Sequence, residues 1–190
     1  MSDRSERVCP VERAGHLDTR LRRWLQDPQK ILGPYVREGM TMLDVGCGPG
    51  YFTTAAARLV GGNGRVIAAD LQQGMLDKLQ QRIAGTDIEP RVTLHRCAED
   101  RIGAAGPVDF ILAFYVVHEI PDQAGFYQEA ASLLAGDGSM LVVEPPFHVS
   151  KRKFGASMQL AREAGLVSGP GPRLLLCKTA LLTRAGRKRA

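Results

Sequence analysis

A short apolar segment runs directly into three alternating glycines, and this arrangement constrains the fold more than any other part of the chain. Residues 40–45 read Met-Thr-Met-Leu-Asp-Val, and Gly46, Gly48 and Gly50 follow. The apolar run at residues 41–45 is typical of a buried strand, and the Ala-rich residues 53–59 are typical of a helix. Glycines permit positive φ and let a ligand lie against bare backbone, although tight turns and helix caps also use them. The segment predicts a strand, a loop and a helix, with a ligand site at the end of the strand.

The same alternation of strand and helix continues along the chain. Further short apolar or β-branched runs predict strands at residues 65–70, 91–97, 108–113 and 139–143. Helical periodicity lies between them, at residues 72–83 and 123–134. Strands that alternate with helices form right-handed crossovers, so we expect an α/β fold with a mostly parallel sheet and helices on both faces.

Both ends of the chain depart from this alternation. Leu17, Leu21, Trp24 and Leu25 predict an amphipathic helix, and Asp27-Pro28 is typical of the start of a second helix, which we expect to reach about Val36.

Near the other end, Ser150 is typical of a helix N-cap and Gly165 of a helix end. The apolar runs at 174–177 and 180–182 then predict a closing, antiparallel pair of strands at the sheet edge.

Composition excludes several classes of protein. The 190 residues are 44% hydrophobic and 24% charged, which is typical of one globular domain. No apolar run is long enough to span a bilayer and the first residues lack a signal peptide's apolar region, so we expect a cytoplasmic location. The four cysteines have no CxxC spacing, so neither a metal site nor a disulfide framework is expected: Cys9, Cys47, Cys97 and Cys177.

Positive charge is concentrated towards the C-terminus. Residues 151–190 carry a net charge of +9, whereas residues 1–150 carry −4. A basic end of this kind suits nucleic acid, an anionic membrane or an acidic substrate, or it is a solvated face with a frayed tail.

Two acids near the glycine loop narrow the choice of ligand. Asp70 ends the next expected strand, twenty residues after Gly50, where an acid commonly binds ribose hydroxyls. Asp44 precedes the first glycine, where its carboxylate suits a cationic amine and repels a pyrophosphate. The spacing is G-x-G-x-G, and Tyr51 stands where a dinucleotide fingerprint has its third glycine. An adenosine cofactor with an amino group and no phosphate fits these residues best.

These motifs resemble those of a known family. Asp44-Val-Gly-Cys-Gly-Pro-Gly50 and Val66-Ile-Ala-Ala-Asp-Leu71 are similar to the first two motifs of class I S-adenosylmethionine-dependent methyltransferases, of the small type 11/25-like kind. The similarity extends through residues 108–121 and 133–144 and covers roughly residues 40–184. It implies a Rossmann-like three-layer sandwich whose seven-stranded, mostly parallel sheet has an antiparallel last strand.

The resemblance also implies a set of residues that bind S-adenosylmethionine and release S-adenosylhomocysteine. Residues 46–50 would flank the methionine part of the cofactor. Asp44 would lie near its amino group, and Asp70 would bind the ribose hydroxyls. Leu71 and Met75 would lie against adenine, although Met75 also suits a helix core. Many relatives have an acid where this chain has Cys97, so the Ala98 backbone together with Glu99 or Asp100 would take over adenine recognition. The complete cofactor set is Asp44, Gly46, Cys47, Gly48, Pro49, Gly50, Asp70, Leu71, Met75, Cys97, Ala98, Glu99, Ala113 and Phe114.

Polar residues beyond the expected strand at 108–113 are the candidates for chemistry. Methyl transfer is an in-line displacement, so a base is optional, and Tyr115 and His118 are best placed to orient an acceptor or take its proton. The alternative is that His118 only caps a turn. A zinc motif is excluded because Asp122 stands where H-E-x-x-H needs its second histidine, and His95 is expected to be structural. The Glu-Pro-Pro-Phe run at 144–147 differs in its first residue and position from the motif of amino-directed DNA methyltransferases.

We therefore expect a methyltransferase with three parts: an N-terminal helical lid at 1–38, a cofactor-binding domain at 39–184 and a basic tail at 185–190. His16, Arg20 and Trp24 are candidate lid contacts to the substrate. The acceptor is expected to be a small molecule. The alternatives are an RNA or protein methyltransferase that uses the basic C-terminus, and a regulatory protein that binds the cofactor without catalysis.

Overall fold

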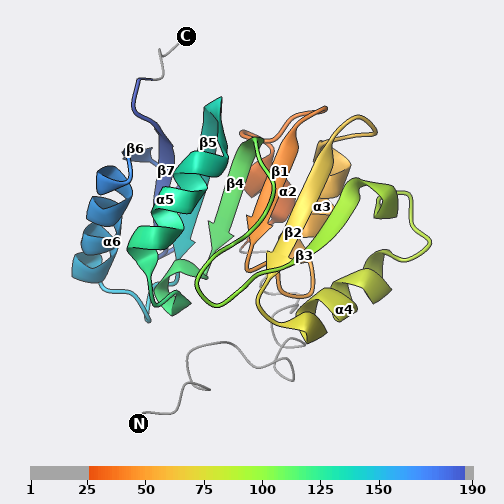
Figure 1. The fold of residues 1–190 in the computed structure, drawn as a ribbon, viewed down its shortest axis with the longest axis horizontal. Helices are drawn as coiled ribbons and strands as arrows, with labels where there is room; N and C mark the ends of the chain where they lie inside the picture. The colour runs from red at the N-terminus through yellow and green to blue at the C-terminus, as the bar shows by residue number, and fades with distance from the viewer. Residues whose placement is uncertain (1–25, 187–190) are drawn as a thin grey trace.

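The computed structural model describes residues 26–186, and its central feature is a seven-stranded sheet of order β3-β2-β1-β4-β5-β7-β6 (Figure 1). The strands are β1 (Thr41–Val45), β2 (Arg65–Asp70), β3 (Val92–Arg96), β4 (Val108–Phe114), β5 (Leu134–Glu144), β6 (Leu166–Pro170) and β7 (Lys178–Arg184). Strands β1 to β5 pair in parallel, and β7 runs antiparallel to both β5 and β6. The expected seven-stranded α/β sheet with an antiparallel last strand is confirmed.

Helices cover both faces of this sheet. They are α2 (Pro28–Leu32), α3 (Tyr51–Leu59), α4 (Gln73–Ile83), α5 (Gln123–Leu133) and α6 (Lys151–Glu163), with short 3-10 turns η3 (Glu89–Arg91) and η4 (Val117–Glu119). Side chains of α5 and α6 share one buried cluster with the sheet, and side chains of α2, α3 and α4 share the other. The three layers are visible in Figure 1.

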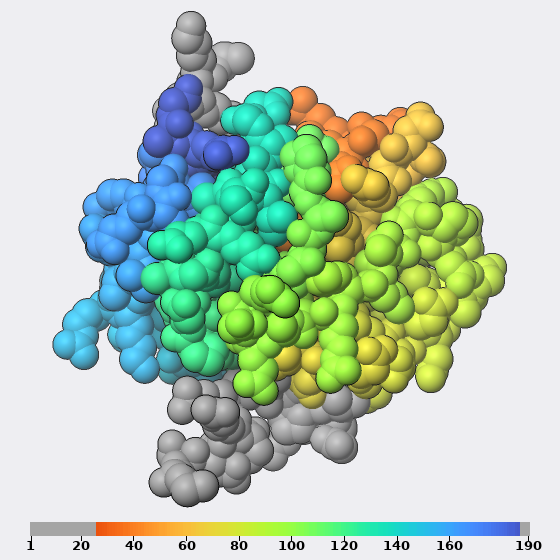
Figure 2. All heavy atoms as spheres, viewed as in Figure 1, coloured from red at the N-terminus to blue at the C-terminus, as the bar shows by residue number. Residues whose placement is uncertain are grey.

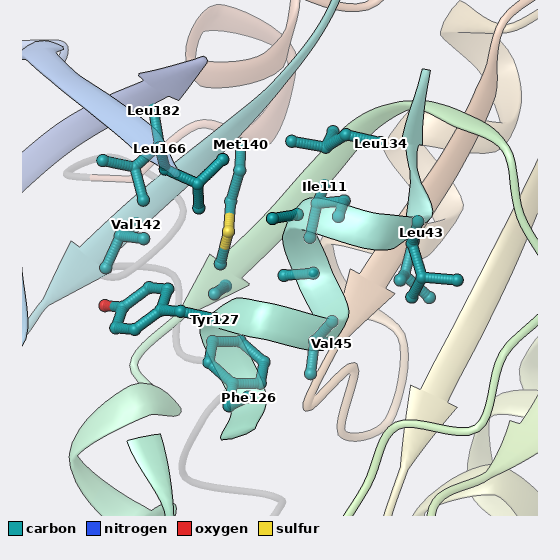
Figure 3. Close-up of a cluster of buried hydrophobic side chains, with 14 of the residues drawn as sticks. Leu43, Val45, Ile111, Phe126, Tyr127, Leu134, Met140, Val142, Leu166 and Leu182 are labelled. Carbon is teal, nitrogen blue, oxygen red and sulfur yellow. The ribbon is translucent and has the colours of Figure 1, made fainter. Parts of the chain in front are cut away.

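The core beneath α5 and α6 is built from alternate residues of the central strands. Figure 3 shows Phe126 and Tyr127 of α5 beside Met140 and Val142 of β5, with Leu182 of β7 above them. All five side chains are buried. Removal of their apolar surface from water holds α5 on the sheet and so fixes the segment between β4 and α5.

The first helix is shorter than the sequence predicts. Asp27 caps it as expected, because its Oδ1 accepts a hydrogen bond from the Gln29 N–H at 3.0 Å. The helix ends at Leu32 and not near Val36, since Pro34 has no N–H to donate and its ring clashes with the preceding turn.

The last part of the sheet also differs from the prediction. The run at 174–177 is not a strand, and β6 (Leu166–Pro170) takes the place beside β7. As the edge strand, β6 tolerates Pro170, which cannot donate to a neighbour. Strand β5 begins at Leu134 and not at the expected residue 139. Its register with β4 shifts between Val108 and Phe110, which accommodates the extra residues.

Several expectations concern residues that the structure does not describe. The helix at 17–25, the lid contacts His16, Arg20 and Trp24, and most of the tail at 185–190 lie outside the described residues. The division into lid, domain and tail and the cytoplasmic location therefore stay predictions. Between residues 26 and 186, no helix is both long and apolar enough to cross a bilayer.

Candidate functional site

A cavity of about 1060 Å³ opens at the carboxyl ends of β1, β2 and β4. The chain leaves β1 towards β2 and returns on the other side as β4, so the loops after β1 and β4 diverge and leave a crevice at this switch point. Fourteen of the sixteen predicted site residues line the cavity: Asp44, Gly46, Cys47, Gly48, Pro49, Asp70, Leu71, Met75, Cys97, Ala98, Glu99, Phe114, Tyr115 and His118.

The other two predicted residues lie outside the cavity lining. Ala113 is fully buried within β4. It precedes Phe114, which ends the strand and lines the cavity. Gly50 is the N-cap of α3 with φ of 84°, and a Cβ added there would overlap the Leu79 side chain of α4. Gly50 therefore allows α3 and α4 to approach closely, and its contact with the cofactor stays a prediction.

The glycine loop presents backbone to the cavity. Gly46 and Gly48 have φ of 68° and 52°, values that disfavour residues with a Cβ. A Cβ added at Gly46 would lie 2.6 Å from Cγ2 of Val116, whereas one added at Gly48 would meet no protein atom within 4 Å. The space beside Gly48 is thus open to a ligand that approaches the bare loop.

Asp70 connects the end of β2 to this loop. Its Oδ2 accepts a hydrogen bond from the Gly48 N–H at 2.9 Å, and its Oδ1 accepts one from the Gln72 N–H at 2.9 Å. Burial raises the pKa of Asp70, while these two N–H groups act in the opposite direction. Each oxygen keeps further acceptor capacity, which suits a ligand with neighbouring hydroxyl groups.

Asp44 is the most deeply buried acid in the cavity lining, with 2% of its surface exposed. Its Oδ2 accepts a hydrogen bond of 2.6 Å from the Thr53 hydroxyl of α3. Burial raises the pKa of Asp44 to about 7, and the charge of Asp70 adds to this shift. A cationic ligand group would relieve the repulsion between the two carboxylates, so the site favours an amine or sulfonium over a phosphate.

The loop that follows β3 forms one side of the cavity, and backbone hydrogen bonds hold it in place. The Cys97 N–H donates to the Asp70 carbonyl at 3.0 Å, and the Ala98 N–H donates to the Arg101 carbonyl at 3.1 Å. Burial raises the pKa of the Cys97 thiol to about 11, so this sulfur stays protonated and uncharged. Leu71, 36% exposed, and the buried Met75 offer apolar surface on the same side, as expected for a flat aromatic ring.

At the other end of the cavity, His118 of η4 is bound to a residue that the sequence did not single out for chemistry. His118 Nδ1 lies 2.6 Å from Oε2 of Glu144, and the His118 backbone N–H donates to Oε1 at 3.1 Å. Glu144 is 2% exposed and ends β5, whereas the His118 side chain is 26% exposed. This hydrogen bond is the main cause that raises the pKa of His118. Because a carboxylate only accepts, Nδ1 carries a proton and Nε2 is the nitrogen that can take one.

Tyr115 occupies the bend between β4 and η4. Its φ of 61° is unusual for a residue with a bulky side chain and indicates local strain that the surrounding contacts maintain. The Tyr115 hydroxyl contacts the Cys177 sulfur at 3.0 Å and accepts from the Gln26 side chain. The Gln26 carbonyl also accepts a hydrogen bond from the Tyr51 hydroxyl, so Gln26 contacts two tyrosines that line the cavity.

A model of the methyltransferase domain family matches residues 36–165, a range that includes the glycine loop, Asp70, His118 and Glu144. The chain belongs to this family of methyltransferase domains. The membership that the motifs at residues 44–50 and 66–71 indicate is thereby confirmed.

Individual relatives of this methyltransferase domain are distant. Demethylmenaquinone methyltransferase of Bacillus cereus is 24% identical over 121 residues, which are 64% of this chain and 50% of that protein. The chain spans about half the length of the curated relatives that it matches.

Solved structures share its fold. A SAM-dependent methyltransferase from Aquifex aeolicus superposes with a TM-score of 0.82 at 23% identity, covering 92% of this chain and 98% of the other. A TehB-like SAM-dependent methyltransferase from Corynebacterium glutamicum superposes with a TM-score of 0.69 at 16% identity, covering 92% and 100%. The class I methyltransferase fold is therefore shared over nearly the whole chain.

Proposed function

We propose that this protein transfers a methyl group from S-adenosylmethionine to a small-molecule acceptor whose proton is taken by His118. The observation that carries this proposal is the pairing of His118 with the buried Glu144 in the same cavity as the glycine loop. One end of the cavity suits a cationic adenosine cofactor, and the other end holds a base. A volume of about 1060 Å³ accommodates a cofactor together with a small acceptor.

The residues of the first end fit the cofactor by their chemistry. Asp44 and Asp70 supply carboxylates for an amino group and for ribose hydroxyls, and Gly48 supplies open backbone. Leu71 and Met75 supply apolar surface for adenine, and the segment from Cys97 to Glu99 would lie at the edge of the adenine ring. When bound, S-adenosylmethionine supplies a methyl group on a positively charged sulfur, which makes that carbon electrophilic.

The residues of the second end act on the acceptor. His118 accepts the acceptor's proton at Nε2, and Glu144 stabilises the imidazolium that forms. Phe114 and Tyr115 line the same cavity, and in this proposal their rings shield the methyl group from water and favour in-line alignment. The Bacillus cereus relative, whose name identifies demethylmenaquinone as its substrate, supports a small-molecule acceptor.

Two measurements test the proposal. Calorimetry with S-adenosylmethionine should detect binding to the wild type, strong weakening by Asp70→Ala and by Gly48→Val, and little change for Gly85→Ala. A screen of small phenols, enols and thiols that detects released S-adenosylhomocysteine should then find turnover that His118→Asn reduces about a hundredfold. Absence of cofactor binding in the wild type, or turnover only with RNA or protein acceptors, would show the proposal to be wrong.

Tyr115→Phe separates the two catalytic candidates. The Tyr115 hydroxyl is engaged by Cys177 and Gln26, and so we expect it to position the acceptor and not to take its proton. Tyr115→Phe should therefore reduce turnover by no more than about tenfold, a tenth of the effect of His118→Asn.

A further inference from the structure

Three large apolar side chains project into solvent close to the mouth of the cavity. Phe147 is 86% exposed, Leu175 is 67% exposed and Leu176 is 66% exposed. Phe147 and Leu176 come from different loops but line the same groove, of about 570 Å³, between the start of α6 and the start of β7. The light-blue connection from β5 into α6 forms part of the lower left edge of the molecule in Figure 2.

Positive charge surrounds these apolar side chains. Lys151, Lys153 and Lys178 line the groove, and no acidic residue does so within the part of the chain that the structure describes. The Lys178 ammonium donates to the Pro146 carbonyl at 3.1 Å and so joins the two loops. We call the six residues Phe147, Leu175, Leu176, Lys151, Lys153 and Lys178 the basic apolar patch.

The backbone of Leu176 adopts a conformation that is unusual for leucine. Its φ is 59°, a conformation that costs energy for a residue such as leucine and that asparagine or glycine adopts more easily. The side chain gains no compensating burial, because 66% of it is exposed. Leu176 is therefore both strained and exposed, which makes it a candidate contact for a partner outside the folded chain.

The patch is continuous with the cavity. His148, Val149 and Lys153 line both the groove and the cavity. Whatever covers the patch therefore also lies against one side of the cavity mouth.

We propose that the basic apolar patch docks this protein on the surface of an anionic lipid bilayer. Exposed phenylalanine and leucine side chains at projecting loops, with lysines around them, suit the boundary between acyl chains and anionic headgroups. A nucleic acid would use the lysines but would leave the two exposed leucines without a role. The excess charge of residues 151–190 has the sign that such a surface attracts.

Co-sedimentation of the full-length protein with phosphatidylcholine vesicles, with and without phosphatidylglycerol, tests the proposal. We expect binding only to the anionic vesicles, weakened by added salt. Phe147→Ser and Leu176→Asn should each lower the affinity about tenfold, because each removes one large apolar side chain. Lys151→Gln should lower it about fivefold. Val167→Ser, which removes an exposed apolar side chain of β6 outside the patch, should leave binding unchanged.

Leu176→Asn protects the test against loss of folding. Asparagine adopts positive φ more readily than leucine, so the variant should unfold at the same temperature as the wild type or higher. An Asn variant that is folded and binds vesicles as well as the wild type would overturn the proposal, as would absence of wild-type binding.

Two other occupants give different results. Sedimentation velocity without lipid would reveal a dimer that Phe147→Ser disrupts if a second copy covers the patch. Combined replacement of Arg187, Lys188 and Arg189 by glutamine would abolish vesicle binding by itself if the tail makes the contact. Either result contradicts the proposal, and neither depends on methyl transfer.

Discussion

His118 Nδ1 and Glu144 Oε2 lie 2.6 Å apart although their positions in the chain differ by 26. The pairing follows from the sheet, because β4 and β5 are parallel neighbours and Phe114 faces Val143 in the register. The Tyr115 N–H extends this pairing by donating to the Val143 carbonyl at 2.8 Å, which brings η4 beside the end of β5. A buried carboxylate and a partly exposed imidazole thus meet at the rim of the cavity.

Glu144→Gln should change the pH dependence of turnover. Glu144 raises the pKa of His118, so in the wild type the neutral base forms at a higher pH than for an ordinary histidine. Without Glu144 the pKa of His118 falls, so turnover of the variant should increase at a lower pH than turnover of the wild type. Its maximal rate should be about a hundredfold lower. Profiles of kcat against pH measure both changes. A lower maximum with an unshifted profile would contradict a role for Glu144 through His118.

Asp44 should couple cofactor binding to proton release. Its pKa is raised to about 7, so at pH 6 the buried carboxyl is mostly protonated. A cationic group that binds beside it favours the ionised form, and affinity should therefore rise towards pH 7 by up to about tenfold per pH unit. Calorimetry in buffers with different ionisation enthalpies measures the released proton, and Asp44→Asn should bind without that pH dependence.

The same shift predicts a change in stability. Because the folded pKa lies above the unfolded value of 3.8, the contribution of Asp44 to stability is fully present below pH 3.8 and is lost as the pH rises through about 7. Asp44→Asn should therefore gain stability relative to the wild type between pH 4 and pH 8. Denaturant unfolding at several pH values checks this, and a constant difference would argue against the raised pKa.

Gly48→Ala and Gly85→Ala form a matched pair. Both glycines have positive φ, so each alanine variant should lose about 1–2 kcal/mol of stability. No protein atom lies within 4 Å of a Cβ added at either position, so neither variant creates a clash. Only Gly48 lines the cavity, so only Gly48→Ala should weaken cofactor binding. Equal affinity of the two variants would show that no ligand approaches the loop at Gly48.

Tyr127→Phe should loosen the contact between α5 and α6. The Tyr127 and Ser157 hydroxyls are hydrogen-bonded at 2.9 Å in a buried setting. Loss of one partner leaves the other buried without a hydrogen bond, which costs about 1–3 kcal/mol. Thermal or urea unfolding measures this cost. The double variant Tyr127→Phe with Ser157→Ala should recover part of it, because neither polar group then remains.

The sequence alone determined the layout of the fold and one half of the candidate site. Strand-like runs and helical periodicity predicted β1 and β2 with their observed bounds, because buried parallel strands and amphipathic helices leave local patterns. The glycine loop and Asp70 were found for the same reason, since a strand, a turn and a helix that bind one ligand are contiguous or regularly spaced.

The tertiary structure decided the other half. Glu144 stood out in the sequence only through its resemblance to a different motif, and the neighbouring ends of β4 and β5 make it the partner of His118. No signal in the sequence marked Thr53, and the position of α3 beside β1 makes its hydroxyl the hydrogen-bond donor to Asp44. The exposed Phe147 and Leu176 share a groove only because β7 returns beside β5. Contacts of this kind depend on which strands become neighbours in the sheet, and local sequence periodicity does not specify the strand order.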